Sequence, residues 1–140
     1  MIVDGLIEAM KANAGVAAVV GEKVFPFVAG AARERPYITL QRISHFRFKH
    51  LRSVDSLNAP RVQVDGWGKT AAQCRAIEDA VIAWVKEAAD NILAGEVRLD
   101  GKVVQCISID DVNDEHETPP AAQEQGSHRV SIDLIVAFLP

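Results

Sequence analysis

The chain has 140 residues, of which 49% are hydrophobic and 24% are charged, and its formal net charge is -4. This length suits one domain with a genuine core, and the composition argues against wholesale disorder. The negative charge argues against a surface built throughout to grip nucleic acid, and no apolar run approaches the roughly 20 residues that cross a bilayer.

The N-terminal third predicts one short helix and two strands. Residues 2–14 place apolar side chains at helical spacing, which indicates an amphipathic helix that Gly15 ends. A small-residue turn leads to a weak strand over 23–28, which its proline limits to an edge or irregular position. Residues 37–49 then alternate as a long strand, and the break in alternation near 42–44 indicates a bulge.

The middle of the chain predicts a strand followed directly by a long helix. Residues 61–67 alternate, and from about Thr70 to Ala89 the apolar spacing becomes helical. Thr70 and Gln73 are spaced as a capping box, in which each side chain can satisfy a backbone N–H of the first turn. The helix carries one apolar stripe, which we expect to pack on a sheet: Cys74, Ile77, Val81, Trp84, Val85 and Ala88.

The last third predicts two more strands, over 102–112 and 128–139, joined by a long polar loop. We expect flexible loops near 50–60 and 113–128. The order of elements shows no regular strand–helix alternation, so we expect a single α+β domain over 1–140. Its sheet would be mostly antiparallel with four to five strands, and one long and one short helix would pack on one face.

Charge is unevenly distributed along the sequence. Five basic residues and no acidic one lie between positions 35 and 54, namely Arg35, Arg42, Arg47, Lys49 and Arg52. The densest acidic cluster spans 110–117. Phe46 and Phe48 among the basic residues suggest base stacking, but strict alternation favours rings that point into the core. We therefore favour an acidic protein surface, such as the 110–117 cluster of a neighbouring copy, over DNA as the partner of the basic segment.

No motif for nucleophilic catalysis, phosphate binding or metal binding occurs in the sequence. The acidic cluster could hold a hard cation, but its spacing matches no known cage, and a solvated loop is the favoured reading. The four histidines are scattered, and Cys74 and Cys106 fit no metal spacing, so we expect two buried free thiols. We expect no catalytic residue, no metal and no cofactor.

Five stretches in this order resemble the family of bacteriophage tail-completion proteins, also called head–tail joining or tail terminator proteins. They are GVAAVVGEKVFPFVA, RPYITLQRIS, RVQVDGWGKTAAQCRAIEDAV, VVQCISIDDVNDEHE and HRVSIDLIVAF. The most telling are the strand R-V-Q-V-D-x-W feeding an Ala-rich helix and the late H-R-x-S-x-D strand. The chain departs from the family pattern at Gly66, where a larger or sulfur-containing residue is common, and in the proline-rich segment 118–120.

The resemblance implies a structural virion protein without catalytic activity, similar to the minor tail protein U of phage lambda. Such proteins form a ring, commonly a hexamer, that ends polymerisation of the tail tube and presents a surface to the head connector. The implied partners are further copies of the chain, the tail tube protein and a head connector or head-completion protein. DNA would be met only as it passes through the channel, and no membrane is involved. The implied location is the head-proximal end of the tail, after assembly in the bacterial host cytoplasm.

Opposite charges on two segments suit a ring in which one patch meets the other on the next subunit. The expected assembly contacts are Arg42, Arg47, Lys49, Arg52, Asp111, Asp114 and Glu115. Asp65 and Asp133, which alternation places outward on neighbouring strands, are expected to be structural or to face the channel. Two other classes stay open: a head-completion or neck protein, and a small α+β ligand-binding domain.

Overall fold

Six strands form one sheet in the order β1–β2–β3–β6–β5–β4 in the computed structural model, which describes residues 2–26, 34–47, 58–117 and 127–139. The strands are β1 (Val24–Pro26), β2 (Tyr37–Arg47), β3 (Asn58–Gly68), β4 (Val97–Leu99), β5 (Lys102–Glu117) and β6 (Ser127–Leu139). All neighbours are antiparallel except β1 and β2, which are parallel. The predicted α+β class is confirmed, whereas the expected four to five strands are one or two too few.

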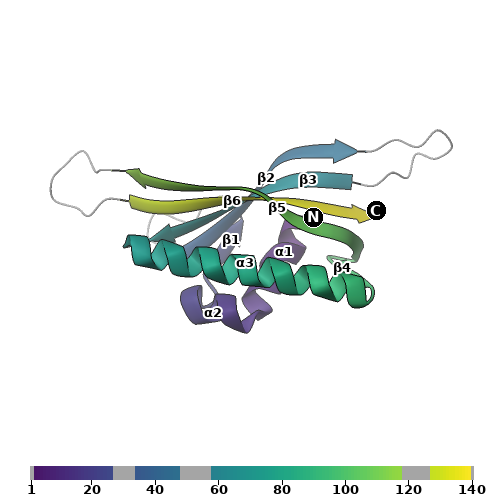
Figure 1. Cartoon of the computed structure of the whole chain (residues 1–140), viewed down its shortest axis with the longest axis horizontal. Helices are drawn as coiled ribbons and strands as arrows, with labels where there is room; N and C mark the ends of the chain where they lie inside the picture. The colour runs from purple at the N-terminus through teal and green to yellow at the C-terminus, as the bar shows by residue number, and fades with distance from the viewer. Residues whose placement is uncertain (1, 27–33, 48–57, 118–126, 140) are drawn as a thin grey trace.

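In the described ranges, three helices cover one face of this sheet and none covers the other (Figure 1). They are α1 (Ile2–Ala12), α2 (Ala14–Val20) and α3 (Ala71–Ala94). The expectation of a single short helix ended by Gly15 was wrong. Asn13 begins a second helix instead, because its side chain accepts a hydrogen bond from the backbone N–H of Val16 at 3.0 Å.

The strands next to the predicted loops are longer than their composition suggested. β5 continues to Glu117 and β6 begins at Ser127, so the predicted loop over 113–128 was too long at both ends. The loop predicted near 50–60 likewise loses Asn58–Pro60 to β3. Pairing with β6 holds the acidic end of β5 in strand conformation, because residues 111–117 lie in register with β6 and alternate residues there can form ladder hydrogen bonds. The remaining loop residues, 48–57 and 118–126, lie outside the described part of the chain.

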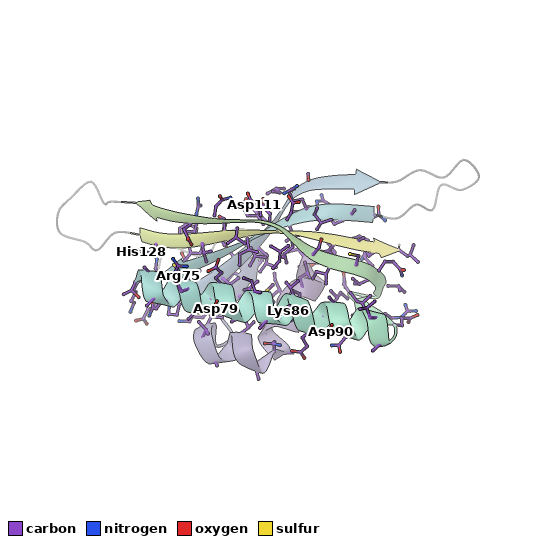
Figure 2. The ribbon with its side chains drawn as sticks, viewed as in Figure 1. Arg75, Asp79, Lys86, Asp90, Asp111 and His128 are labelled. Carbon is purple, nitrogen blue, oxygen red and sulfur yellow. The ribbon has the colours of Figure 1, made fainter. Side chains whose placement is uncertain are left out.

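The core lies between the three helices and the sheet. Five of the six residues in the predicted apolar stripe of α3 are buried, and Ala88 is half-buried. Along the outward side of α3 lie the charged residues Arg75, Asp79, Lys86 and Asp90 (Figure 2). Thr70 caps the helix as predicted, and its hydroxyl accepts from the Gln73 N–H at 3.2 Å. Gln73 reaches back to the N–H of Lys69 at 2.7 Å, one residue earlier than an ideal capping box requires.

Gly66 allows α3 to approach the sheet closely. A Cβ atom at this position would lie 2.5 Å from Cγ2 of Ile77 and 3.0 Å from Cγ1 of Val130. Ile77 and Val130 are both fully buried, so neither can move aside without displacing other core atoms. The departure from the family pattern at Gly66 therefore matches a tight helix–sheet contact.

β4, which the sequence analysis did not predict, forms a tight hairpin with β5. Leu99 pairs with Lys102, and Asp100 and Gly101 form the two-residue connection with φ values of 52° and 74°. Positive φ at both central residues is the type I′ arrangement, for which Asp-Gly is a preferred sequence. The Asp-Gly dipeptide between alternating residues was a usable signal for β4.

Replacing Gly66 by alanine is expected to lower the free energy of unfolding by about 1–3 kcal/mol, because the added methyl overpacks the Ile77 contact. Urea denaturation followed by circular dichroism measures this change. Gly95→Ala is the matched control, because Gly95 is exposed, has extended backbone and has open space around its Cα. Its effect is expected to stay within about 0.5 kcal/mol. Equal stabilities of the two variants would show that the close approach at Gly66 is not a constraint.

Candidate assembly surfaces

Polar and aromatic side chains form rows across the helix-free face of the sheet. Strand pairing places Thr39, Asp65, Ser131 and Asn113 at one level. Tyr37, Trp67 and Arg129 lie at the next level on one side, and Gln41, Gln63, Asp133 and Asp111 on the other. Because Val62, Val64 and Gly66 alternate with these residues in β3 and face α3, the rows belong to the opposite face.

Asp65 is the centre of a buried hydrogen-bond network on this face. Asp65 faces away from α3, as its alternation in β3 predicts, but only 5% of its surface is exposed. The Ser131 hydroxyl donates to Oδ1 at 2.5 Å, and the Gln63 amide donates to both carboxylate oxygens at 2.9 and 3.0 Å. The bond from Ser131 ties β3 to β6, and the bonds from Gln63 hold the carboxylate in place within β3, which is a structural use of the carboxylate.

Trp67 forms an aromatic and cationic group beside that network. Its ring stacks on Tyr37 at a centroid distance of 6.0 Å, and its indole N–H donates to the Thr39 hydroxyl at 3.2 Å. The guanidinium groups of Arg129 and Arg35 lie 5.2 and 5.8 Å from the Trp67 ring centroid. Cations at this distance are attracted by the ring face. The group therefore holds β2, β3 and β6 together at one end of the sheet.

Arg61 neutralises part of the acidic cluster within the chain. It forms an ion pair with Asp110 and a second with Asp133 at 3.3 Å. The hydrogen bond that Arg61 donates to the Asp110 carboxylate raises the pKa of Arg61 above its ordinary value, so the guanidinium stays charged. Asp110 reaches this position because the ladder between β5 and β6 shifts at a bulge between Ile109 and Asp111. The sequence reading did not find this pairing.

The predicted basic and acidic contact residues lie toward opposite edges of the sheet. Arg42 is exposed on β2, whereas Asp111 and Asp114 are exposed on β5, and β3 and β6 separate the two strands. Asp111 lies on the helix-free side of the sheet (Figure 2). The structure therefore brings no basic member of the predicted set next to an acidic member within one chain, as far as the chain is described.

The other predicted contact residues are only partly covered by the structure. The backbone of Arg47 ends β2 opposite Asn58, and the backbone of Glu115 lies opposite Arg129. The side chains of Arg47 and Glu115, and all of Lys49 and Arg52, lie outside the described part of the chain.

Among the described residues, no group of three or more His, Cys, Asp or Glu side chains is arranged to hold a metal ion. No helix in the described ranges is long and apolar enough to cross a membrane.

The two cysteines differ in environment. Cys74 is buried under β3, and burial raises the pKa of its thiol above the ordinary value. Cys106 is exposed, so the expectation of two buried thiols was wrong for this residue. The cause is a ladder shift between Val104 and Cys106: Val104 and Ile107 point into the core, and Cys106 between them does not.

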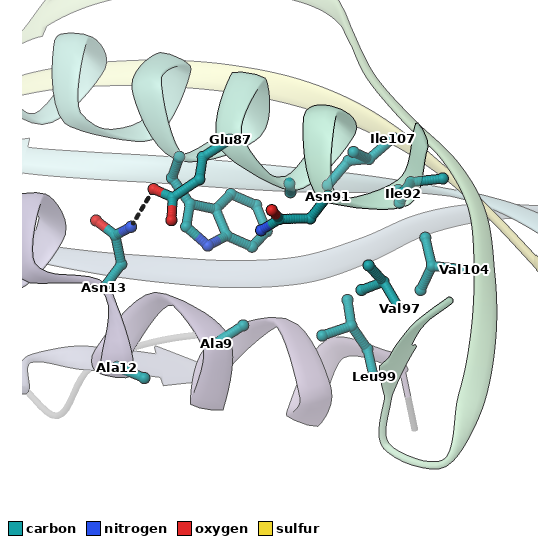
Figure 3. Close-up of a pocket in the computed structure, with 12 residues that line it drawn as sticks. Ala9, Ala12, Asn13, Glu87, Asn91, Ile92, Val97, Leu99, Val104 and Ile107 are labelled. Atoms are coloured by element: carbon teal, nitrogen blue, oxygen red, sulfur yellow. Dashed lines mark hydrogen bonds between the residues drawn. The ribbon is translucent and has the colours of Figure 1, made fainter. Parts of the chain in front are cut away.

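A cavity of about 220 Å³ lies between α1, α3 and the β4–β5 hairpin (Figure 3). Apolar side chains such as Ile92, Leu99 and Val104 line most of it, and among its lining residues Asn13 donates a hydrogen bond of 3.2 Å to Glu87. Ligand pockets usually measure about 300–1,000 Å³ and present several convergent polar groups. The cavity is better explained as a packing gap than as the ligand site of a small binding domain.

These features define a class: an α+β domain whose buried polar groups bond to one another and whose strands β2 and β5 expose charges of opposite sign at Arg42 and at Asp111 and Asp114. The chain belongs to the family of tail completion protein gp17, because the sequence model of that family matches residues 4–134. The predicted family resemblance is thereby confirmed. The protein is a structural protein of the phage virion.

Comparison with solved structures agrees at the level of the fold. A chain from the structure titled "Virion of native gene transfer agent (GTA) particle" is 12% identical and superposes with a TM-score of 0.63. The match covers 100% of this chain and 95% of that chain. No curated protein sequence matches this chain.

Asp65→Ala is expected to lower the free energy of unfolding by about 1–3 kcal/mol, because the substitution leaves Gln63 and Ser131 without their buried acceptor. Urea denaturation measures the loss. Asp79→Ala, at an exposed site on α3, is the control and is expected to change stability by about 0.5 kcal/mol or less. Comparable effects at the two sites would contradict a structural role for the Asp65 network.

A thiol-reactive dye is expected to label one cysteine per native chain and two per unfolded chain. Cys106 is exposed, whereas Cys74 is buried. Burial raises the pKa of Cys74, so this residue stays in the protonated thiol form, which does not react with the dye. The Cys106→Ser variant should show no fast phase at neutral pH. A fast phase that persists in this variant would mean that Cys74 is accessible.

Proposed function

We propose that this protein assembles as a ring on the finished end of the tail tube, stops further polymerisation and offers the surface to which the head docks. A hexamer is the proposed ring size. The proposed partners are other copies of the chain, the tail tube protein, and a head connector or head-completion protein. The site of action is the head-proximal end of the tail, after assembly in the host cytoplasm.

The observation that carries this proposal is the separation of charge across the sheet. Arg42 is exposed on β2 near one side, and Asp111 and Asp114 are exposed on β5 near the other. A molecule with different, complementary patches on opposite sides associates head to tail, and such an interface closes into a ring when the rotation between copies is suitable. The proposed contacts are Arg42, Arg47, Lys49 and Arg52 of one copy with Asp111, Asp114 and Glu115 of the next.

The helix-free face supports a second part of the proposal, namely that this face borders the channel. Its described surface includes the exposed carboxylates of Asp111 and Asp110 and the half-buried one of Asp133. Asp110 and Asp133 are paired with Arg61, and Arg35 and Arg129 lie over Trp67 on the same face, so the charge of this face is mixed. Among the acidic groups, the exposed carboxylate of Asp111 is the one that would repel the phosphates of passing DNA. Asp65 and Asp133 then act as structural groups of a channel wall.

A head-completion or neck protein is the second candidate, because it would also act as a ring and would differ mainly in its partner. The family assignment to tail completion favours the tail role.

Particles that lack this protein are expected to carry overlong tails, because nothing ends polymerisation of the tube. Negative-stain electron microscopy of a deletion mutant, with the gene supplied from a plasmid as control, measures tail length and head filling. Tails of normal length on heads that are empty or leaking would instead identify a head-completion protein. Normal particles without the protein would refute both candidates.

A further inference from the structure

One side of α3 carries apolar side chains that the described part of the chain leaves partly or fully exposed. Leu93 has 88% of its surface exposed, compared with 44% at Ile43 and Leu139, the other exposed large apolar side chains in the described ranges. A helix turns about 100° per residue, so Ile82 and Ala89 lie on the same side of α3 as Leu93. Both are half-buried. Single exposed apolar side chains are common, whereas a stripe of them on one side of a helix indicates a surface that a partner covers.

This stripe points away from α1 and α2. Asn91, which lines the cavity between α3 and α1, lies almost half a turn from Leu93 around the helix. On the same side as Asn91, Glu87 accepts the hydrogen bond from Asn13 at the start of α2. Away from the β4 hairpin, α1 packs on β1 and β2, whereas α3 packs on β3, β6 and β5. The side of α3 that faces away from α1 therefore lies on the β5 side of the molecule, where α3 runs along β5 and β6 (Figure 1).

β5 continues this apolar surface at the outer side of the sheet. Ile109 and Val112 pair with Leu134 and Ile132 of β6, whose side chains are fully buried on the face that meets α3. Residues directly opposite each other in an antiparallel ladder share a face, so Ile109 and Val112 also face the helix layer. Both are only half-buried, because β5 is the last long strand on this side of the sheet. We define the edge strip as the five apolar residues Ile82, Ala89, Leu93, Ile109 and Val112.

Within the described ranges, no strand extends the sheet beyond Ile109 and Val112. β4 pairs with β5 only as far as Val104. The residues on both sides of β4 are described, and they lead into α3 and into the turn to β5, so β4 itself does not continue along β5. The outer backbone groups of β5 beyond Val104 are thus a place where another chain can bind.

The edge strip adjoins carboxylates that we propose above as contacts between copies. Asp111 is exposed next to Val112 on the helix-free face, and Asp114 is exposed two residues beyond Val112 on the other face. Asp114 faces the helix layer because it pairs with Val130, which is buried there. An apolar centre with a polar rim is the usual arrangement of a protein–protein interface. The strip and the carboxylates therefore form one surface.

We propose that the next copy in the ring covers the edge strip and that Leu93 is the apolar anchor of this contact. The inference rests on the proposed ring and adds an apolar part to its charged contacts. In that ring the helix-free face borders the channel, so the helices lie on the outer surface and the two sides of each sheet face the neighbouring copies. The edge strip lies on one of those sides and is therefore turned toward another copy. A contact between unlike sides is heterologous, as a closed ring requires.

Site-specific photo-crosslinking in assembled particles tests this contact. The photoreactive residue p-benzoylphenylalanine replaces Leu93 in particles that contain no wild-type copy of the protein. Irradiation is expected to give a ladder of covalent oligomers of this chain on a denaturing gel, because each copy contacts the next through this position. The matched control carries the same residue in place of Ala83, which is exposed and lies opposite the buried stripe of α3, and it should give no ladder. A product that links the chain only to a different virion protein overturns the proposal.

Competition between variants gives a second readout. Leu93→Asp places a carboxylate in the proposed contact, and because Leu93 is exposed in the single chain, the variant should unfold at the same temperature as the wild type. Losing the burial of one leucine weakens association by about tenfold. In cells that also make the untagged wild type, tagged Leu93→Asp is expected to be about tenfold less abundant in particles than tagged Ala83→Asp. Equal incorporation of the two variants would contradict a role for Leu93.

The outcomes separate this inference from the proposed function. Particles that carry the photoreactive residue at position 93 and have tails of normal length, but give no ladder, overturn the edge-strip contact and leave the ring proposal intact. Products that stop at a covalent dimer show that two copies meet strip to strip, which overturns the head-to-tail contact proposed here. Particles that form normally without the protein overturn the ring proposal itself.

Discussion

The contact of α3 with β3 and β6 determines what the rest of the molecule can do. Helix and sheet meet at Gly66, where Ile77 takes the space that a side chain would otherwise fill. The fully buried aliphatic side chains of the two central strands are thereby required on the face that meets α3, namely Val62, Val64, Val130, Ile132, Leu134 and Val136. The opposite face carries polar and aromatic residues. At the edges of the sheet, the short strands β1 and β4 each pair with three residues of the neighbouring long strand. Because the helices cover one face of the sheet, contacts with other molecules can form through the other face and the edges.

The features that the sequence revealed are those set by local spacing. Alternation in β3 and β6 and the stripe on α3 were readable because one face of each element is buried. α2 was missed because its seven residues are all small or apolar and show no polar face. The acidic end of β5 was read as loop because Asp and Asn are poor strand formers, and only the partner strand β6 holds them in the ladder. Elements held by tertiary pairing leave no periodic signal.

The same limit applies to the candidate surfaces. The charge clusters were visible as runs in the sequence, but their position on opposite sides of the sheet depends on the strand order, which spacing does not determine. The partners of Asp65 and Arg61 lie 66 and 72 positions away in the chain, on β6. Alternation in the sequence predicts that such residues face away from the core. Only the register between strands shows which of their side chains contact one another. The register also shows that Asp110 is already paired with Arg61, and that Asp111 and Asp114 stay exposed at the edge.

The two tryptophans of the chain sit on opposite sides of the sheet in different surroundings. Trp84 is 6% exposed between the helices and the sheet, whereas Trp67 is half-buried on the helix-free face beside two guanidinium groups. Indole emission shifts with the polarity around the ring, so the protein carries two intrinsic optical reporters. One follows the integrity of the interior, and the other follows whatever approaches the open face.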